Sequence, residues 1–88
     1  MKRNKLEIIR DILKTIQDNH NSIKPTPLLR KSNLSSTRFN EYFQDLIKKE
    51  LILEKGIKGS RIISLTEKGL RYLDKYKSII GFIEEFEL

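Results

Sequence analysis

The first part of the chain carries apolar residues at the three- and four-residue spacing of amphipathic helices. A first helix is predicted over residues 5–17, because Asn4 and Glu7 have the types and the spacing of a capping box. At about 100° per residue, its apolar side chains fall within one arc that faces a core. They are Leu6, Ile9, Ile12, Leu13 and Ile16.

Two further helices are predicted in a helix-turn-helix arrangement. The second is short, with Thr26 as its cap, Pro27 at its first position, and a turn at Asn33, a residue that tolerates left-handed backbone. The third extends over residues 35–49 and is capped by one of its two leading serines. Its inner stripe is apolar and aromatic. The members of that stripe are Phe39, Tyr42, Phe43, Leu46 and Ile47.

After Glu50 the apolar pattern changes from a helical to a strand-like period. Two short apolar runs, at 51–53 and 62–65, flank a glycine-containing loop at 54–61, which predicts a β-hairpin. A last helix follows over 66–85, capped by its leading threonine. The predicted fold is therefore mainly α with a small β-hairpin, in the order helix-helix-helix-strand-strand-helix.

This order of elements, together with four motifs, resembles the winged helix-turn-helix superfamily. The motifs are K-L-E-I-I-R-D-I-L near the start, S-N-L-S at the turn, R-F-N-E-Y-F-Q-D-L-I-K-K-E-L-I in the third helix and S-L-T-E-K-G-L-R-Y-L after the hairpin. The sequence is most similar to small archaeal winged-helix DNA-binding proteins that dimerise through a long C-terminal helix. Similar proteins often have Gly where this chain has Glu50, which predicts a less tight turn at the exit of the third helix.

The resemblance implies that the third helix enters the major groove of DNA and that the hairpin, or wing, lies along the backbone or the minor groove. Short and hydrogen-bonding side chains on a helix suit phosphates and base edges, and cations on a wing suit phosphates. The predicted DNA-binding residues are Ser35, Ser36, Thr37, Arg38, Asn40, Glu41, Gln44, Lys58 and Arg61. Lys2, Arg3 and Lys5 are expected to add backbone contacts.

These residues also have interpretations that involve no DNA. Ser35 is explained as a helix cap, and Arg38 by an ion pair with Glu41 three residues later. The other polar residues of the outward arc suit a solvated helix surface. Lys58 and Arg61 are the least ambiguous, because the tip of a glycine-flanked hairpin has little structural use for cations.

Composition favours binding to a polyanion and argues against an enzyme. The formal net charge is +6, and residues 1–65 carry 14 basic and 7 acidic side chains, whereas residues 66–88 carry 4 and 5. A solubilising surface would also explain a net charge of this size. Cysteine is absent, histidine occurs once, and no Gly-rich phosphate loop or convincing pair of acids is present. We therefore expect no catalytic, metal or cofactor site and no small-molecule ligand.

The same composition excludes a membrane protein, because no apolar stretch is long enough for a membrane span and no signal-peptide core follows the basic N-terminus. A cytoplasmic location is expected.

The last helix carries an apolar face that predicts self-association. Its members follow one another at gaps of 4, 3, 4 and 3, the spacing of a coiled-coil seam. They are Tyr72, Tyr76, Ile79, Ile83 and Phe86. Leu73 and Ile80 are expected to face the domain's own core, and Ile8 to join the interface. The alternative is that the first helix covers this stripe within a monomer, whereas the resemblance favours a homodimer with antiparallel helices.

The chain is accordingly predicted to have a winged helix-turn-helix DNA-binding domain at 1–65 and a coiled-coil-like dimerisation helix at 66–88 packed on the same domain. The favoured function is a sequence-selective transcription regulator that binds double-stranded DNA as a homodimer, because acids on the third helix oppose indiscriminate contact with phosphates. An architectural DNA-binding protein with low sequence preference is the first alternative. A winged-helix protein-interaction module without nucleic acid is the second.

Overall fold

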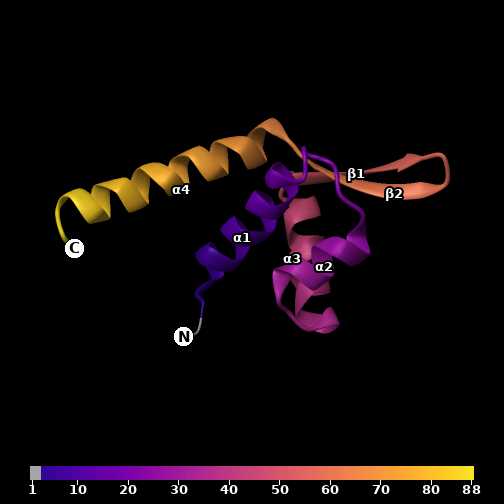
Figure 1. The fold of residues 1–88 in the computed structure, drawn as a ribbon, viewed down its shortest axis with the longest axis horizontal. Coiled ribbons are helices and arrows are strands. Elements are labelled where there is room, and N and C mark those ends of the chain that lie inside the picture. Colours follow the sequence, from indigo (N-terminus) through magenta and orange to yellow (C-terminus); the bar gives the residue numbers. More distant parts are fainter. Residues whose placement is uncertain (1–2) are drawn as a thin grey trace.

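The computed structural model describes residues 3–88, and within them four helices and one β-hairpin form (Figure 1). The elements are α1 (Lys5–Asp18), α2 (Pro25–Ser32), α3 (Ser36–Lys48), β1 (Ile52–Ile57), β2 (Ser60–Leu65) and α4 (Glu67–Glu85). This order confirms the predicted fold class, including its C-terminal helix. None of the helices in this part of the chain is long and apolar enough to cross a bilayer.

The helix α1 lies in the middle of the hydrophobic core and packs against α2, α4 and β2. Its capping box forms as predicted, with the Glu7 N–H donating to Asn4 Oδ1 at 2.8 Å. The buried arc differs from the predicted one, because Leu6 is 55 % exposed and Ile8 only 3 %. Since α1 packs against two helices, its buried arc is wide and extends to Ile8. The expectation that Ile8 joins an intermolecular interface is therefore wrong.

The turn between α2 and α3 is fixed by short side chains. The helix α2 begins at Pro25, one residue before the predicted cap Thr26. Proline suits this first position because its φ is helical and the first helical turn needs no backbone N–H. Asn33 ends the helix in the predicted left-handed conformation, with a φ of 61°. The hydroxyl of the buried Ser32 then accepts from the Leu34 N–H at 3.3 Å, which directs the chain into α3.

The strands β1 and β2 are longer than predicted and form an antiparallel ribbon that projects from the body (Figure 1). Its turn consists of Lys58 and Gly59, whose φ values of 48° and 78° are both left-handed, as in a type I′ hairpin. Near the body, Ile63 of β2 also exchanges two backbone hydrogen bonds with Ile23, at 3.1 and 2.7 Å. Most of the predicted loop at 54–61 is strand, because the outer half of the ribbon has no buried face and therefore no apolar alternation.

The exit of α3 is a tight turn centred on Glu50. The N–H groups of Glu50 and Leu51 donate to the carbonyls of Ile47 and Leu46 at 3.0 and 2.9 Å, which is a Schellman arrangement. Glu50 has a φ of 59°, in the left-handed region that favours glycine. The prediction of a less tight turn is therefore wrong, because the two hydrogen bonds and the buried Leu51 hold Glu50 in this conformation.

The start of α4 is tied to the same turn. The Thr66 hydroxyl accepts from the Gly69 N–H at 3.1 Å, as a helix cap, and donates to the Glu50 carbonyl at 2.5 Å. The Thr66 N–H donates to the Leu51 carbonyl at 3.2 Å. A Cβ on Gly69 would overlap that carbonyl oxygen, so glycine is required by the approach of two backbones. We call these four residues, Glu50, Leu51, Thr66 and Gly69, the junction.

Substitution of Gly69 by alanine is expected to destabilise the fold by about 1–3 kcal/mol, because the added methyl group meets the backbone of the junction. Gly81→Ala is the matched control, since a Cβ there has nothing within 4 Å. It is expected to stabilise by about 0.5–1 kcal/mol through helix propensity. Urea unfolding at one fixed protein concentration measures both. Equal effects of the two substitutions would contradict the steric role of Gly69.

Glu50→Gly is expected to stabilise the fold by about 0.5–1 kcal/mol. The left-handed conformation strains a residue with a Cβ by about 1–2 kcal/mol, and the extra freedom of glycine in the unfolded chain offsets part of the gain. Asn33→Gly serves as the comparison, because Asn33 has a similar φ of 61° but is a residue type that tolerates it. Urea unfolding measures the free energy of unfolding of both variants. A gain in stability that is no larger for Glu50→Gly than for Asn33→Gly would show that the turn at Glu50 is unstrained.

Candidate nucleic-acid interface

Aromatic residues anchor one side of α3 on the core. Phe39, Phe43 and Leu46 are buried, and the rings of Phe39 and Phe43 stack with their centroids 5.8 Å apart. At the start of the helix, Ser35 Oγ accepts from the Arg38 N–H at 3.2 Å. The interpretation of Ser35 as a cap is therefore correct. The helix is held firmly from one side and presents the other to solvent.

The solvent side of α3 exposes every residue predicted for it. They are Ser35, Ser36, Thr37, Arg38, Asn40, Glu41 and Gln44. At about 100° per residue, these residues from Thr37 to Gln44 share one arc with the exposed Lys48, and Arg38 lies at the edge of that arc. Within residues 3–88 no ion pair joins Arg38 to Glu41, so pairing between them does not account for Arg38.

The acids of α3 differ in their surroundings. Lys49 Nζ donates to Asp45 Oδ2 at 2.9 Å, and this hydrogen bond holds the pKa of Asp45 below its ordinary value. Glu41 has no ion-pair partner in the part of the chain that the structure describes, and it lies exposed on the arc. The arc therefore combines hydrogen-bonding groups with a free carboxylate, which differs from a surface made only to follow phosphates.

The two predicted wing cations differ from each other. Lys58 occupies the turn of the hairpin, is exposed and makes no ion pair among the described residues. Arg61 donates from Nε and Nη2 to Glu54 Oε2, at 3.0 and 2.5 Å. This ion pair raises the pKa of Arg61. The argument that a hairpin tip has no structural use for a cation therefore holds for Lys58 and is wrong for Arg61. Only the register of a two-residue turn would have revealed the partner, since it places Glu54 diagonally across the ribbon.

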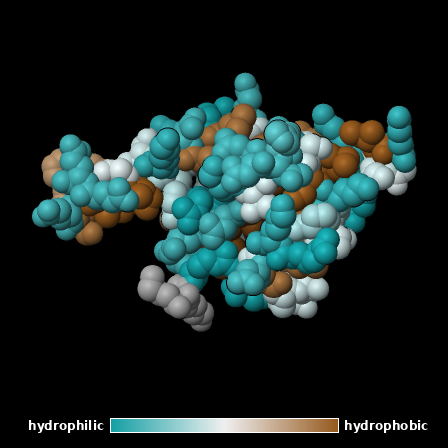
Figure 2. All heavy atoms as spheres, in the orientation of Figure 1, coloured by the Kyte–Doolittle hydropathy of each residue, from teal (hydrophilic) through white to brown (hydrophobic). Residues whose placement is uncertain are grey.

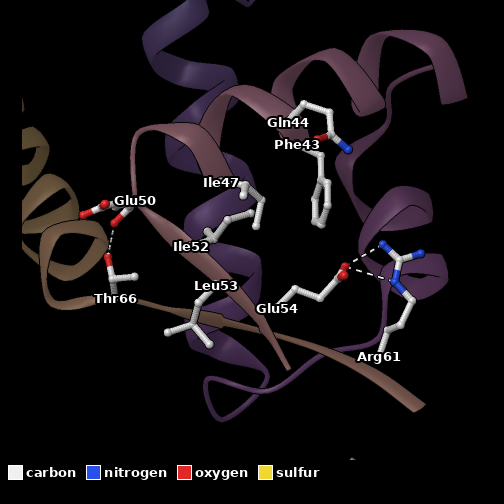
Figure 3. Close-up of a pocket in the computed structure, with 9 residues that line it drawn as sticks. All are labelled: Phe43, Gln44, Ile47, Glu50, Ile52, Leu53, Glu54, Arg61 and Thr66. Atoms are coloured by element: carbon white, nitrogen blue, oxygen red, sulfur yellow. Dashed lines mark hydrogen bonds and ion pairs between the residues drawn. The ribbon is translucent and has the colours of Figure 1, made fainter. Parts of the chain in front are cut away.

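An open groove separates α3 from the wing and brings one predicted residue of each, Gln44 and Arg61, to its walls (Figure 3). It encloses about 480 Å³ between Gln44 of α3 and the Glu54–Arg61 pair of the ribbon, with Phe43 between them. Gln44 projects from the helix into the same space that Arg61 reaches from the opposite wall (Figure 3). Two elements distant in sequence thus face one concave surface.

The N-terminal cations have separate roles. Arg3 bridges α1 and α2, because Nη1 donates to Asp11 Oδ2 and Nη2 to the Ser32 carbonyl, both at 2.8 Å. Its guanidinium is thus engaged within the fold, and the expected backbone contact from Arg3 is not supported. Lys5 is exposed. Lys2 lies outside the described residues.

The predicted seam of α4 divides into two parts, and its first part packs on α1. The Tyr72 hydroxyl donates to the Leu6 carbonyl at 2.8 Å, and burial raises the pKa of Tyr72. The Arg10 guanidinium carbon lies 5.1 Å from the centre of the Tyr76 ring. Leu73 is buried, as predicted. The alternative in which the first helix covers the stripe is therefore correct for this part of the seam.

The second part of the seam is exposed at the end of α4, which extends away from the body (Figure 1). Ile79 is 56 % exposed, Ile83 36 % and Phe86 57 %. Phe82, which sequence reasoning missed, is 56 % exposed and packs on Phe86 with ring centroids 4.9 Å apart. Figure 2 shows the resulting hydrophobic surface on this arm of the molecule. Ile79, Phe82, Ile83 and Phe86 are called the distal patch.

Comparisons with known proteins agree with this architecture. A protein-family model described as winged helix-turn-helix matches residues 2–84. A search of curated proteins found no match. Among solved structures, Sso10a-2, a DNA-binding protein from Sulfolobus solfataricus, is 21 % identical and has a TM-score of 0.78, over 97 % of this chain and 86 % of that one.

Two further solved structures have the same fold. F93 from STIV, a winged-helix DNA-binding protein, is 18 % identical with a TM-score of 0.75, over 90 % of this chain and 91 % of that one. F-93 from SSV1 is 24 % identical with a TM-score of 0.72, over 98 % and 97 % of the two chains. At these identities the likeness is one of fold.

Proposed function

Because the chain belongs to the winged helix-turn-helix family, we propose that it binds double-stranded DNA, with α3 in the major groove and the wing on the neighbouring backbone or minor groove. The observation that carries this proposal is the exposed polar arc of α3, whose Gln44 lines an open groove opposite Arg61 of the wing. Sso10a-2 and F93 from STIV, which share the fold, are described as DNA-binding proteins. Residues 1–65 carry 14 basic and 7 acidic side chains, and this positive net charge adds electrostatic attraction to a polyanion.

The polar residues of α3 fall into two groups, those suited to contact DNA phosphates and those suited to contact base edges. The serines and Thr37 at the start of the helix are short enough to bring its backbone N–H groups to a phosphate. Asn40 and Gln44 can each form two hydrogen bonds to an adenine edge, and Arg38 can bind a guanine edge or a phosphate. Glu41 can accept from a cytosine amino group, whereas it would only repel the DNA backbone.

These contacts favour a sequence-selective regulator over an architectural protein. Phosphate contacts are nearly independent of sequence, so an architectural binder needs cations along its contact surface. The arc of α3 carries Lys48, with Arg38 at its edge, but it otherwise presents a hydroxyl, two amides and the carboxylate of Glu41, which has no ion-pair partner among the described residues. We therefore propose that α3 supplies base contacts and that Lys58 on the wing supplies a phosphate or minor-groove contact.

Substitutions on α3 and on the wing are expected to have different effects. Lys58→Gln should weaken binding to all duplexes and make the salt dependence of the dissociation constant shallower by about one phosphate contact. Gln44→Ala should instead reduce discrimination between a selected site and random DNA, by about 1–3 kcal/mol if two hydrogen bonds to one base are lost. Fluorescence anisotropy over a range of salt measures both effects, after selection of a site from random duplexes.

The outcomes separate the candidate functions. Equal affinity of the unmodified protein for selected and random duplexes, unchanged by Gln44→Ala, would support the architectural alternative. No binding to any duplex at low salt would leave the protein-interaction module as the better hypothesis.

We also propose that the chain forms a homodimer through the distal patch. An exposed apolar surface of this kind on a small domain marks an interface. The Cα radius of gyration is 13.6 Å, against about 12 Å expected for a compact domain of this length, since α4 extends beyond the body. Residues 66–88 thus have two parts, one that packs on the domain and one that is left without a partner inside it. The exposed part would bury its apolar surface against a second copy.

Charge along α4 favours an antiparallel pair. Lys77 comes just before the distal patch, and the acids Glu84, Glu85 and Glu87 come at its end. An antiparallel pair centred on the distal patch sets the acidic end of one copy near Lys77 of the other. A parallel arrangement would set like charges side by side, which is unfavourable.

Ile79→Glu is expected to convert the dimer to a monomer, because a charge without a partner in a desolvated interface costs several kcal/mol. Ile57→Glu is the matched control, since Ile57 is similarly exposed, at 50 % against 56 %, but lies on the wing. Light scattering across a concentration series measures the molecular mass of both variants. The proposal fails if the unmodified protein is monomeric at high concentration, or if Ile57→Glu dissociates it equally.

A further inference from the structure

The ion pair on the wing points to a control of DNA affinity. We propose that Glu54 is an internal substitute for a DNA phosphate: it holds Arg61 in the free protein and thereby lowers the affinity of the wing for arbitrary duplex. This inference rests on the proposed DNA-binding function and deepens it. It makes Glu54, which carries no favourable DNA contact of its own, a residue that sets the affinity of the wing for DNA.

The geometry of the pair resembles recognition of a phosphate oxygen. Arg61 places both Nε and Nη2 on a single carboxylate oxygen of Glu54, at 3.0 and 2.5 Å. Guanidinium binds carboxylate and phosphate oxygens with the same donors, so one anion can replace the other. The side chain of Glu54 is 33 % exposed and that of Arg61 is 61 % exposed. The acid is the more enclosed partner, and the guanidinium is the one that solvent or an incoming anion can reach.

The register of the hairpin explains why the side chain of Arg61 pairs with Glu54. Directly across the ribbon from Arg61 is Gly56, which offers no side chain, whereas Glu54 lies opposite Ile63 on the same face. Arg61 and Glu54 are thus diagonal neighbours, a separation that long side chains span. The two-residue turn at Lys58 and Gly59 fixes this register, so the pair is a consistent feature of the folded wing.

The pair also lies where a duplex is proposed to bind. Glu54 and Arg61 line the groove that Gln44 enters from α3 (Figure 3). A phosphate that takes Arg61 must displace Glu54 and then lie beside its carboxylate, which repels it. That penalty applies on every sequence, so it lowers the affinity for a random duplex and for a selected site by the same factor. Specificity is the difference between those two affinities and is left unchanged, so the ion pair sets how tightly the wing binds DNA of any sequence.

A cycle of four proteins tests the proposal: the unmodified chain, E54Q, R61Q and the double variant. Binding is measured by anisotropy on a labelled random-sequence duplex over a range of salt. E54Q is expected to bind about two- to fivefold tighter, the range set by the strength of an exposed ion pair. Its salt dependence should steepen by about one contact. R61Q should bind more weakly than the unmodified protein, because it leaves the repelling carboxylate of Glu54 without its partner, and the double variant should lose the gain of E54Q.

The control is Asp18→Asn, which removes the same charge from an exposed pair of α1, where Lys14 Nζ lies 2.9 Å from Asp18 Oδ1. Its affinity should match that of the unmodified protein. Unchanged or weaker binding by E54Q overturns the proposal. So does a double variant that keeps the gain, or an equal gain from Asp18→Asn, because either would make Glu54 a general repulsive charge. If the unmodified chain binds DNA but E54Q binds no tighter, the proposed DNA-binding function stands and the role of Glu54 is overturned. If the unmodified chain binds no duplex, both proposals are overturned.

Discussion

The contact between the backbone of α4 and the carbonyl of Leu51 constrains the rest of the architecture. It is possible only because residue 69 has no Cβ, and it brings the end of α3, the base of the hairpin and the start of α4 to one point. The hydroxyl of Thr66 reinforces it by bonding to both Glu50 and Gly69. Since all three elements leave from this junction, the angle between α3 and the wing is set by backbone contacts. In the proposed complex, that angle decides whether α3 and the wing can contact one duplex.

Fewer cations are free to bind an anion than the net charge indicates. Several are already engaged within the fold: Arg3 with Asp11 and the Ser32 carbonyl, Lys49 with Asp45, and Arg61 with Glu54. Lys55 and Lys58 are the wing cations that make no ion pair among the described residues. A surface of this kind would attract the proposed DNA partner at long range through its overall charge. At short range it depends on matching hydrogen bonds.

Element order and element type could be predicted from the sequence because each depends on local signals. Capping residues, the left-handed Asn33 and the change of apolar period all act within a few residues of where they occur. The outward residues of α3 were found for the same reason, since a helix with an anchored apolar stripe defines its opposite face. Such signals do not depend on which other elements cover a helix.

What could not be predicted depended on tertiary context. The strands extend past their apolar residues because backbone pairing needs no buried side chain in an exposed ribbon. The pair between Glu54 and Arg61 required the register, and the burial of Ile8 required knowing that two helices cover α1. The heptad spacing of α4 was read as one continuous surface, whereas Tyr72 and Tyr76 lie against α1 and Phe82 extends the exposed part.

The wing and the far end of α4 leave the body in opposite directions (Figure 1). The turn at Lys58 and Gly59 and the distal patch share no buried residue, and neither contributes to the hydrophobic core. Mutations in either arm are therefore tolerated by the fold independently of the other. Substitutions at the wing turn can therefore change the surface of the wing while the distal patch is kept, and substitutions in the distal patch can change that surface while the wing is kept, with the core intact in both cases.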